Sequence, residues 1–373
     1  MTKIALIVPY RFVPPRNGGH KAAFGFASAI AHQANFAVLS TDNNDPGSGF
    51  RLIPSFPDHP SKYVLLRYRN RIKAVLRREG ISHVILFQHY QAALLLPALK
   101  RMGIPASIYV QNIEYQRWRS LGKWWWPLMR VYEAWAYRRA DRLFFISPED
   151  RTAAPGLFGI PVSKCDQVDY GIRRPETGEV ASARLEIAAR HGIQPGEKII
   201  LFFGPQHYKP NQDAVLRIAR QIIPVLTASD PLPFRVLICG GGLPADYQTE
   251  IKSDRLSYLG FVEDIEAYVM AADVMVNPIL SGGGVKTKVL ESIACGTPVV
   301  SFAAGAAGID LRVCGTHLRI VEDENDQGFA EAVAGVLAQG KTETPPEFYE
   351  RYEWAQTIKP VLEWSRMSDG KGG

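Results

Sequence analysis

Short apolar runs alternate with longer amphipathic stretches along the first half of the chain. The apolar runs predict strands buried on both faces, at residues 3–8, 36–39, 84–87, 106–110 and 143–146. The amphipathic stretches predict a helix that ends near residue 31 and further helices at residues 62–79, 91–101 and 127–139. Strands that alternate with helices form parallel sheets covered on both faces, so this half is expected to be a doubly wound α/β domain.

The same alternation begins again after residue 171. Strands are predicted at residues 199–203, 234–239, 257–259, 274–277 and 298–301, with helices at 211–226, 264–270 and 286–294. A chain of 373 residues is long enough for two domains, each with its own core. We therefore predict an α/β protein with two Rossmann-like doubly wound domains facing a cleft. The first spans residues 1–170, with a C-terminal helix at 352–368 packing back on it, and the second spans 171–351.

A glycine turn, a short helix and a buried strand are predicted in that order within residues 281–300. Gly282, Gly283 and Gly284 have no Cβ, so the backbone can turn tightly there and approach a ligand. The helix is expected to begin near residue 285 and to end at Gly296. The first N–H groups of such a helix have no partner inside it, so its start favours an anion.

Charged side chains on this short helix add to that preference. Lys286 and Lys288 place two mobile cations on the first turn, which predicts a phosphate or diphosphate ligand. Glu291 shares a face with Thr287 and Lys288, where a carboxylate can accept hydrogen bonds from sugar hydroxyls. A diphosphate with sugar hydroxyls indicates a nucleotide sugar. The alternative is an ordinary glycine turn in which Lys288 and Glu291 form a solvated pair.

Residues 283–300 resemble the donor-binding signature of glycosyltransferase family 4, whose members have the two-domain GT-B fold. Glu291 and the run from Ala294 to Val299 match the second half of the signature, whereas its first glutamate falls on Gly283. Further motifs of the family occur in the expected order, at residues 201–204, 210–215, 260–264, 271–274 and 351–354. The resemblance thus covers most of the chain.

The resemblance implies roles for residues in both halves. It places Gly18 and Gly19 beside the transferred sugar, and Gln111 where many members have a histidine that touches the sugar. The donor side is implied by residues Gly204, Lys209, Phe261, Val262, Gly282, Gly283, Gly284, Thr287 and Glu291. Many members have Arg and Lys after the glycine that corresponds to Gly204. Prolines stand there in this chain, so Lys286 and Lys288 are expected to replace those cations.

Two histidines follow predicted strands near the expected cleft. His20 and His89 are candidates for acid/base catalysis or acceptor binding, and the alternative for each is a surface or helix-capping histidine. The resemblance implies a retaining hexosyltransferase (EC 2.4) that acts mainly by electrostatic stabilisation of the leaving diphosphate. It implies no cofactor and no metal, and the sequence contains no clustered Asp-x-Asp or His/Cys set. Gly283 and Gln111 leave a catalytically inactive nucleotide-sugar-binding protein as the alternative.

Charge is distributed unevenly between the halves. Residues 1–170 carry 23 Lys and Arg against 11 Asp and Glu, whereas the rest of the chain carries 20 against 26. A basic half suits nucleic acid, an anionic membrane surface or an anionic substrate. Nucleic acid is the least expected of these partners, because the basic helices carry no interleaved aromatic platform or recognition motif.

Tryptophans are concentrated within the basic half. Five of the seven lie among arginines and lysines, at Trp118, Trp124, Trp125, Trp126 and Trp135. Tryptophan favours the membrane–water interface, and three consecutive tryptophans cannot all face one core. We therefore expect a cytoplasmic protein that docks on the inner membrane face and glycosylates a lipid-linked saccharide in cell-surface polysaccharide or glycolipid synthesis. The alternative is that these tryptophans fill an ordinary core, as does the apolar stripe of Leu65, Tyr68, Ile72 and Val75.

Overall fold

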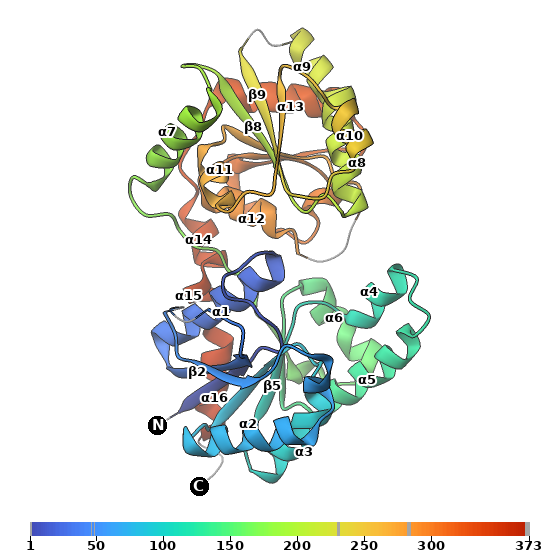
Figure 1. Ribbon diagram of the computed structural model, residues 1–373, viewed down its shortest axis with the longest axis vertical. Coiled ribbons are helices and arrows are strands. Elements are labelled where there is room, and N and C mark those ends of the chain that lie inside the picture. Colours follow the sequence, from blue (N-terminus) through green and yellow to red (C-terminus); the bar gives the residue numbers. More distant parts are fainter. Residues whose placement is uncertain (1, 46, 48, 230–231, 282–284, 370–373) are drawn as a thin grey trace. The chain divides into compact units, whose positions relative to one another are not determined.

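The chain forms two compact units, and the first of them combines the N-terminal part of the chain with its C-terminal segment. The computed structural model describes residues 2–45, 47, 49–229, 232–281 and 285–369. Unit 1 comprises Met1–Gly171 together with Trp354–Gly373, and unit 2 comprises Ile172–Glu353. Each unit contains a parallel sheet covered by helices on both faces (Figure 1). The expected α/β fold with two doubly wound sheets is confirmed.

The described residues of unit 1 form a seven-stranded parallel sheet with the order β3-β2-β1-β4-β5-β6-β7. Its strands are β1 (Lys3–Ile7), β2 (Asn35–Thr41), β3 (Leu52–Phe56), β4 (His83–Phe87), β5 (Ala106–Val110), β6 (Arg142–Phe145) and β7 (Cys165–Gln167). In the central register, Ala5 of β1 pairs with Ala37 of β2 and with Val84 of β4. These strands are almost wholly buried because helices cover both of their faces.

Helices far apart in the sequence share one face of this sheet. Helices α1 (Gly18–Gln33), α15 (Trp354–Thr357) and α16 (Lys359–Asp369) cover it, and Trp364 of α16 packs edge-on against His83 and Phe144. The opposite face carries α2 (Leu66–Arg78), α3 (Ala92–Arg101), α5 (Trp126–Arg139) and α6 (Pro148–Phe158), whose apolar sides form one core with the strands. The short elements are η1 (Pro60–Tyr63), α4 (Glu114–Ser120) and η2 (Val162–Lys164).

The described residues of unit 2 form a six-stranded parallel sheet with the order β10-β9-β8-β11-β12-β13. Its strands are β8 (Lys198–Phe203), β9 (Phe234–Cys239), β10 (Leu256–Gly260), β11 (Val274–Asn277), β12 (Val299–Phe302) and β13 (Leu318–Val321). One core contains α8 (Lys209–Arg217), η3 (Ile218–Ile222), α9 (Ile223–Ser229) and α13 (Asp326–Gln339). The remaining elements are α7 (Glu179–His191), α10 (Ala245–Glu250), α11 (Ile265–Ala271), α12 (Thr287–Ala294), η4 (Ala304–Ala306), η5 (Leu311–Val313), η6 (Gly315–His317) and α14 (Pro346–Tyr352).

The strand order reverses once in each sheet, and these reversals indicate where ligands bind. The connections after β1 and β4 diverge in unit 1, as do those after β8 and β11 in unit 2. Loops that leave neighbouring parallel strands in opposite directions open a crevice at the carboxyl ends of the strands. Both switch points coincide with loops that the sequence indicates as ligand sites.

Local differences from the predicted elements have identifiable causes. The short helix in the glycine-turn segment begins at Thr287 and ends at Ala294, because Lys286 is its N-cap and Gly296 has a left-handed φ of 70° in the following turn. The helix predicted at 211–226 contains a π-helical segment, η3. Strands β3, β7 and β13 were not predicted, because each lies at the edge of its sheet and is only partly buried, so its sequence is not a continuous apolar run. Of the predicted stripe, Tyr68, Ile72 and Val75 pack in the core, as its alternative interpretation stated, whereas Leu65 is exposed.

Trp354 anchors the returning C-terminal segment inside unit 1. A Cβ added to Gly171 would lie 2.1 Å from an indole carbon of Trp354, and one added to Gly25 would lie 2.2 Å from the indole nitrogen. The indole also packs against the rings of Phe26 and Tyr170. Only glycine leaves room for the indole at both positions.

We predict that Gly171→Ala destabilises unit 1 by about 1–3 kcal/mol, because the new methyl group overpacks the indole of Trp354. The matched control is Gly156→Ala in α6, where a new Cβ meets nothing within 4 Å and alanine favours the helix. Urea unfolding followed by tryptophan fluorescence measures both variants. Equal midpoints for the two variants would contradict the assigned role of the indole.

Candidate functional site

Unit 1 contains a polar pocket of about 220 Å³ at the carboxyl ends of β1, β4 and β5. Its lining combines amides, phenols, an imidazole and one ion pair. The lining residues are Tyr10, Asn17, Gly19, His20, Gln88, Tyr90, Gln111, Asn112, Glu114 and Arg117. Three of the predicted site residues, Gly19, His20 and Gln111, therefore lie together. The other seven were not predicted, although five of them lie within four residues of the end of a predicted strand.

The start of α1 forms one wall of this pocket. Asn17 caps the helix, and its Oδ1 accepts a hydrogen bond from the backbone N–H of His20 at 3.0 Å. A Cβ on Gly19 would lie 3.4 Å from Asn17 Oδ1 and 3.8 Å from Gln111 Oε1. The absence of a side chain thus keeps the helix start open to the pocket beside Gln111. Gly18 is the first residue of the same helix.

His20 and Tyr10 form an aromatic pair at this wall, with ring centroids 5.8 Å apart. The ring Nδ1 of His20 accepts a 3.4 Å hydrogen bond from the backbone N–H of Arg16. Burial lowers the pKa of His20, and the nearby Arg16 and Arg11 lower it further. His20 is therefore mainly neutral at pH 7 and can accept a proton or a hydrogen bond.

Gln88 occupies a strained position directly after β4. Its φ is 67°, in the left-handed region that glutamine rarely adopts, and its side chain is 3% exposed. Its Oε1 accepts no hydrogen bond from any residue in the described part of the chain. A buried amide oxygen without a partner is destabilising, so strain and an unsatisfied acceptor coincide in the pocket lining.

A buried glutamate on α5 fixes the start of α4, the helix that carries Glu114 and Arg117. The two oxygens of Glu133 accept hydrogen bonds from the backbone N–H groups of Glu114 and Tyr115, at 2.7 and 2.9 Å. Tyr137 donates a third bond to the same carboxylate at 3.1 Å. Burial raises the pKa of Glu133 to about 7, against the opposing effect of these bonds.

His89 does not line the pocket, so the structure corrects its proposed role in acid/base catalysis or acceptor binding. The side chain is fully buried, with Nε2 3.3 Å from Met129 Sδ and Nδ1 3.8 Å from Glu133 Oε1. Burial lowers its pKa to about 3, so the imidazole stays neutral across the physiological range. His89 follows the strand end closely, but its ring points into the core among Tyr90, Tyr132 and Tyr137.

In unit 2, glycines bring the ends of three strands into close contact. A Cβ on Gly240 would lie 1.8 Å from the carbonyl oxygen of Gly204, and the N–H of Gly240 donates to the carbonyl of Gly260 at 2.6 Å. Gly204 in turn packs against the side chain of Asn211 on α8. A Cβ added to Gly204 would lie 2.9 Å from the amide nitrogen of Asn211. The glycine run that begins at Gly240 is therefore a structural turn, and it holds the loop after β8 in place.

The side chain of Lys288 reaches from α12 to this loop. Its Nζ lies 3.3 Å from Asn211 Oδ1 and 4.7 Å from the ring centroid of Phe202. Burial, with a smaller contribution from Lys286, lowers the pKa of Lys288 to about 7. Burial also lowers the pKa of Lys286. The expectation of two mobile cations is thus corrected for Lys288, whose ammonium is fixed between α8 and β8.

The other predicted donor-side residues lie at the carboxyl edge of the same sheet. Thr287 begins α12 and Glu291 lies one turn further along it. Phe261 follows β10 and is 67% exposed. Val262 beside it is half-buried. Lys209 begins α8, is exposed and forms an ion pair with Asp213. Gly282, Gly283 and Gly284 lie outside the described residues.

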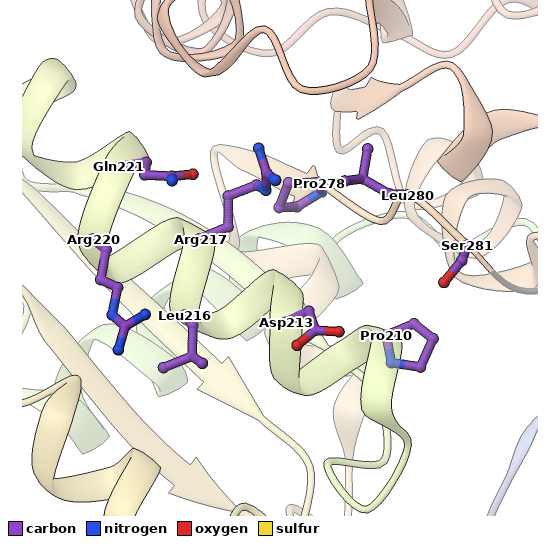
Figure 2. A pocket seen from close by; sticks show the side chains of 9 residues that line it. All are labelled: Pro210, Asp213, Leu216, Arg217, Arg220, Gln221, Pro278, Leu280 and Ser281. Atoms are coloured by element: carbon purple, nitrogen blue, oxygen red, sulfur yellow. The ribbon is translucent and has the colours of Figure 1, made fainter.

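A second pocket in unit 2, of about 300 Å³, lies along the outer side of α8 (Figure 2). None of the predicted donor-side residues lines it. Arg217 points from α8 toward Pro278, but its guanidinium already binds both oxygens of Asp326 at 2.8 Å. Arg220 is likewise paired, with Glu250. Both cations in the lining are therefore neutralised, and we assign no anion site to this pocket.

Two doubly wound units with polar or cationic groups at their switch points match the GT-B class of glycosyltransferases. Residues 20–173 match the model described as "Glycosyltransferase Family 4", and residues 197–339 match "Glycosyl transferases group 1". The two models together cover most of the chain. The chain belongs to the glycosyltransferase family.

Solved structures share the fold at low sequence identity. Anabaena HepE in complex with UDP is 14% identical, with a TM-score of 0.71 over 98% of this chain and 100% of that one. Sucrose-phosphate synthase from Thermosynechococcus elongatus is 16% identical, with a TM-score of 0.70 over the full length of both chains. A D-inositol 3-phosphate glycosyltransferase from Rhodococcus erythropolis is 25% identical over 64% of this chain. That match spans little more than half of the relative, 56% of its length.

We predict that Lys288 makes the binding of a nucleoside diphosphate dependent on pH, with UDP as the probe. Its ammonium becomes neutral as the pH rises through about 7, and a neutral amine no longer attracts the diphosphate. The affinity for UDP should therefore fall by up to about tenfold per pH unit above 7, with uptake of a proton on binding. Titration calorimetry in buffers of different ionisation enthalpy measures both effects.

Uridine, which lacks the diphosphate, is the matched control ligand, and its binding should be independent of pH. Lys288→Met should flatten the pH profile for UDP, and Lys286→Met with Lys288→Met should weaken UDP far more than uridine. Equal losses for the two ligands would contradict the assignment of these lysines to the diphosphate.

Proposed function

We propose that the protein is a retaining glycosyltransferase that moves a sugar from a nucleotide diphosphate sugar to an acceptor hydroxyl. The observation that carries the proposal is the ammonium of Lys288, which lies half-buried at the switch point of unit 2, against Asn211 and Phe202, without an ion-pair partner among the described residues. A buried cation is costly unless an anion compensates it. The diphosphate of the donor is the compensating anion in this proposal.

The chemistry follows from that placement. The bond between the anomeric carbon and the diphosphate oxygen breaks, and the negative charge that develops on the leaving group is stabilised by Lys286, Lys288 and the start of α12. The acceptor oxygen forms the new bond on the same face of the sugar, and its proton leaves with the diphosphate. Glu291 binds the hydroxyls of the ribose, one turn along the helix.

The names of the similar proteins support this class of donor. HepE from Anabaena has been crystallised with UDP, with UDP-glucose, and with UDP and glucose. We infer that the reaction needs no resident metal or cofactor, because the two lysines supply positive charge where other enzymes place a cation. A chelator in the transfer assay should accordingly leave the rate unchanged.

We predict that Glu291→Ala reduces the affinity for the nucleotide sugar by one to two orders of magnitude while the fold is retained. Loss of hydrogen bonds to a charged acceptor is worth about 1.5–3 kcal/mol. Glu331→Ala, at an exposed position on α13, is the matched control. Donor affinity is read by thermal shift with UDP-, GDP- and TDP-sugars. A folded Glu291→Ala variant that binds the donor as wild type does would refute the role given to Glu291.

An acceptor screen with the preferred donor separates an enzyme from an inactive nucleotide-sugar-binding protein. Release of the nucleoside diphosphate together with a glycosylated product supports the proposal. Donor binding without transfer or hydrolysis for every acceptor tested would favour the inactive binding protein.

We further propose that unit 1 docks on an anionic membrane and that the acceptor is a lipid-linked saccharide of a cell-surface polysaccharide or glycolipid. The segment from α4 to α5 exposes large apolar side chains, and Trp124 is 83% exposed. Its exposed neighbours are Leu121, Leu128 and Val131. Cations surround them, at Arg119, Lys123 and Arg130. Tryptophan and basic side chains together favour the interface of an anionic leaflet.

The remaining tryptophans of this segment pack on the protein. The ring centroids of Trp125 and Trp118 lie 4.7 Å apart. The guanidinium of Arg119 lies over the ring of Trp126, and that of Arg139 lies over the ring of Trp135. One of the three consecutive tryptophans is thus exposed, as the sequence indicated. The described helices include none that is both long and apolar enough to cross a bilayer. Docking at the surface is the mode of membrane binding that this arrangement supports.

We predict that the protein co-sediments with vesicles that contain anionic lipid and that binding fades as salt is added. Trp124→Ser with Lys123→Ser should lower the bound fraction strongly, since an exposed aromatic anchor and about 1 kcal/mol of electrostatic attraction are lost. Leu185→Ser, at an equally exposed apolar position on α7, is the control and should change nothing. If the protein does not bind anionic vesicles at low salt, the proposal of membrane docking is contradicted and a soluble acceptor is favoured.

A further inference from the structure

We propose that the pocket of unit 1 selects an acceptor sugar ring that carries no phosphate, and that Glu114 is the residue that determines this specificity. The inference rests on the proposed function, because it names the class of acceptor for the same transfer. It assigns to the acceptor a pocket whose Gly19 and Gln111 the family resemblance places beside the transferred sugar, so the two sugars would meet at this side of the lining. The relatives matched in sequence are named for a phosphorylated acceptor, D-inositol 3-phosphate. We infer that the pocket of this chain differs from theirs.

The charge of the lining excludes a phosphate. Glu114 lies in the lining with only 1% of its side chain exposed. The one cation that faces it, Arg117, is 52% exposed and lies 3.4 Å away, so its charge already compensates the carboxylate. His20 adds no charge, since its pKa is lowered. A phosphate would bring about two further negative charges against a buried carboxylate.

Other cations nearby do not change this balance. Arg11 and Arg16 lie close enough to affect His20, yet neither lines the pocket. Arg11 is also paired with Asp45 at 3.2 Å. The charged side chains of the lining therefore sum to zero at pH 7, and the start of α1 contributes only about half of a positive charge, less than the full negative charge of Glu114.

The polar groups of the lining suit the hydroxyls of a sugar. Gln88 and Gln111 line the pocket, and a side-chain amide can both donate and accept hydrogen bonds. Tyr10, Tyr90 and Asn112 can each donate and accept hydrogen bonds, as sugar hydroxyls do. A volume of about 220 Å³ is smaller than the pockets of drug-sized ligands, which indicates a single ring.

Side-chain contacts hold the carboxylate of Glu114 in the lining. Arg117 donates to both of its oxygens, at 3.5 and 3.4 Å, while Glu133 fixes the backbone beneath it by accepting from the N–H of Glu114 at 2.7 Å. Glu114 and Tyr90 also interact through their side chains. The Glu114 carboxylate is thus a constant part of the pocket lining, and its negative charge disfavours the binding of an anionic sugar ring.

Saturation-transfer NMR with small probes tests the inference without donor or turnover. Wild type should bind D-glucose and myo-inositol at least tenfold more tightly than D-glucose 6-phosphate and myo-inositol 1-phosphate. Glu114→Gln keeps the shape of the side chain and removes its charge, so this preference should shrink toward unity. Glu363→Gln makes the same change at an exposed position on α16 and should leave the preference intact.

Wild type that binds the phosphorylated probes as tightly as the neutral ones, or that binds no neutral probe, would overturn the inference. So would a folded Glu114→Gln variant with an unchanged preference. If Glu114→Gln does not fold, the test rests on wild type alone: the ratio of its affinities for the neutral and the phosphorylated probes either supports or overturns the inference. Because no donor is present, failure here is distinct from failure of the proposed function, which the acceptor screen with the nucleotide sugar reports.

Discussion

The reversal of strand order in each sheet is the constraint on which the described sites depend. Every parallel strand delivers its following loop to the same edge of the sheet, and helices cover the two faces. Only where neighbouring connections diverge does this edge open, between β1 and β4 in unit 1 and between β8 and β11 in unit 2. The fold therefore leaves one natural position for a ligand in each unit. The side chains at these positions differ in chemistry, because one set is neutral and the other is cationic.

Both sites contain groups that oppose stability. Lys288 places an ammonium where burial disfavours its charge, and Gln88 holds a left-handed backbone with an unsatisfied amide oxygen. Each arrangement is maintained by rigid surroundings: Asn211 and Phe202 fix the amine, and β4 fixes the glutamine. Natural sequences depart from local preference mainly where a ligand restores the balance. The two departures coincide with the two switch points.

Much of the fold and part of the sites could be predicted from the sequence. Long apolar runs gave the central strands, because strands buried on both faces leave a continuous pattern. Gly19 and Gln111 were predicted through motif position, and the structure places them side by side. Glu114 and Glu133 were missed, because their pairing joins residues nineteen apart on different helices and leaves no periodic signal. His89 was misjudged, since nearness to a strand end does not fix the direction of a side chain.

The return of the chain to unit 1 has a consequence for how the protein is made. Trp364 of α16 covers His83 and Phe144 on a face of the first sheet, and Trp354 fills the space left by two glycines. The segment that completes unit 1 is thus synthesised after the whole of unit 2. Domains of a growing chain usually fold in the order in which they leave the ribosome. In this chain, unit 1 can reach its complete form only after unit 2 has been synthesised.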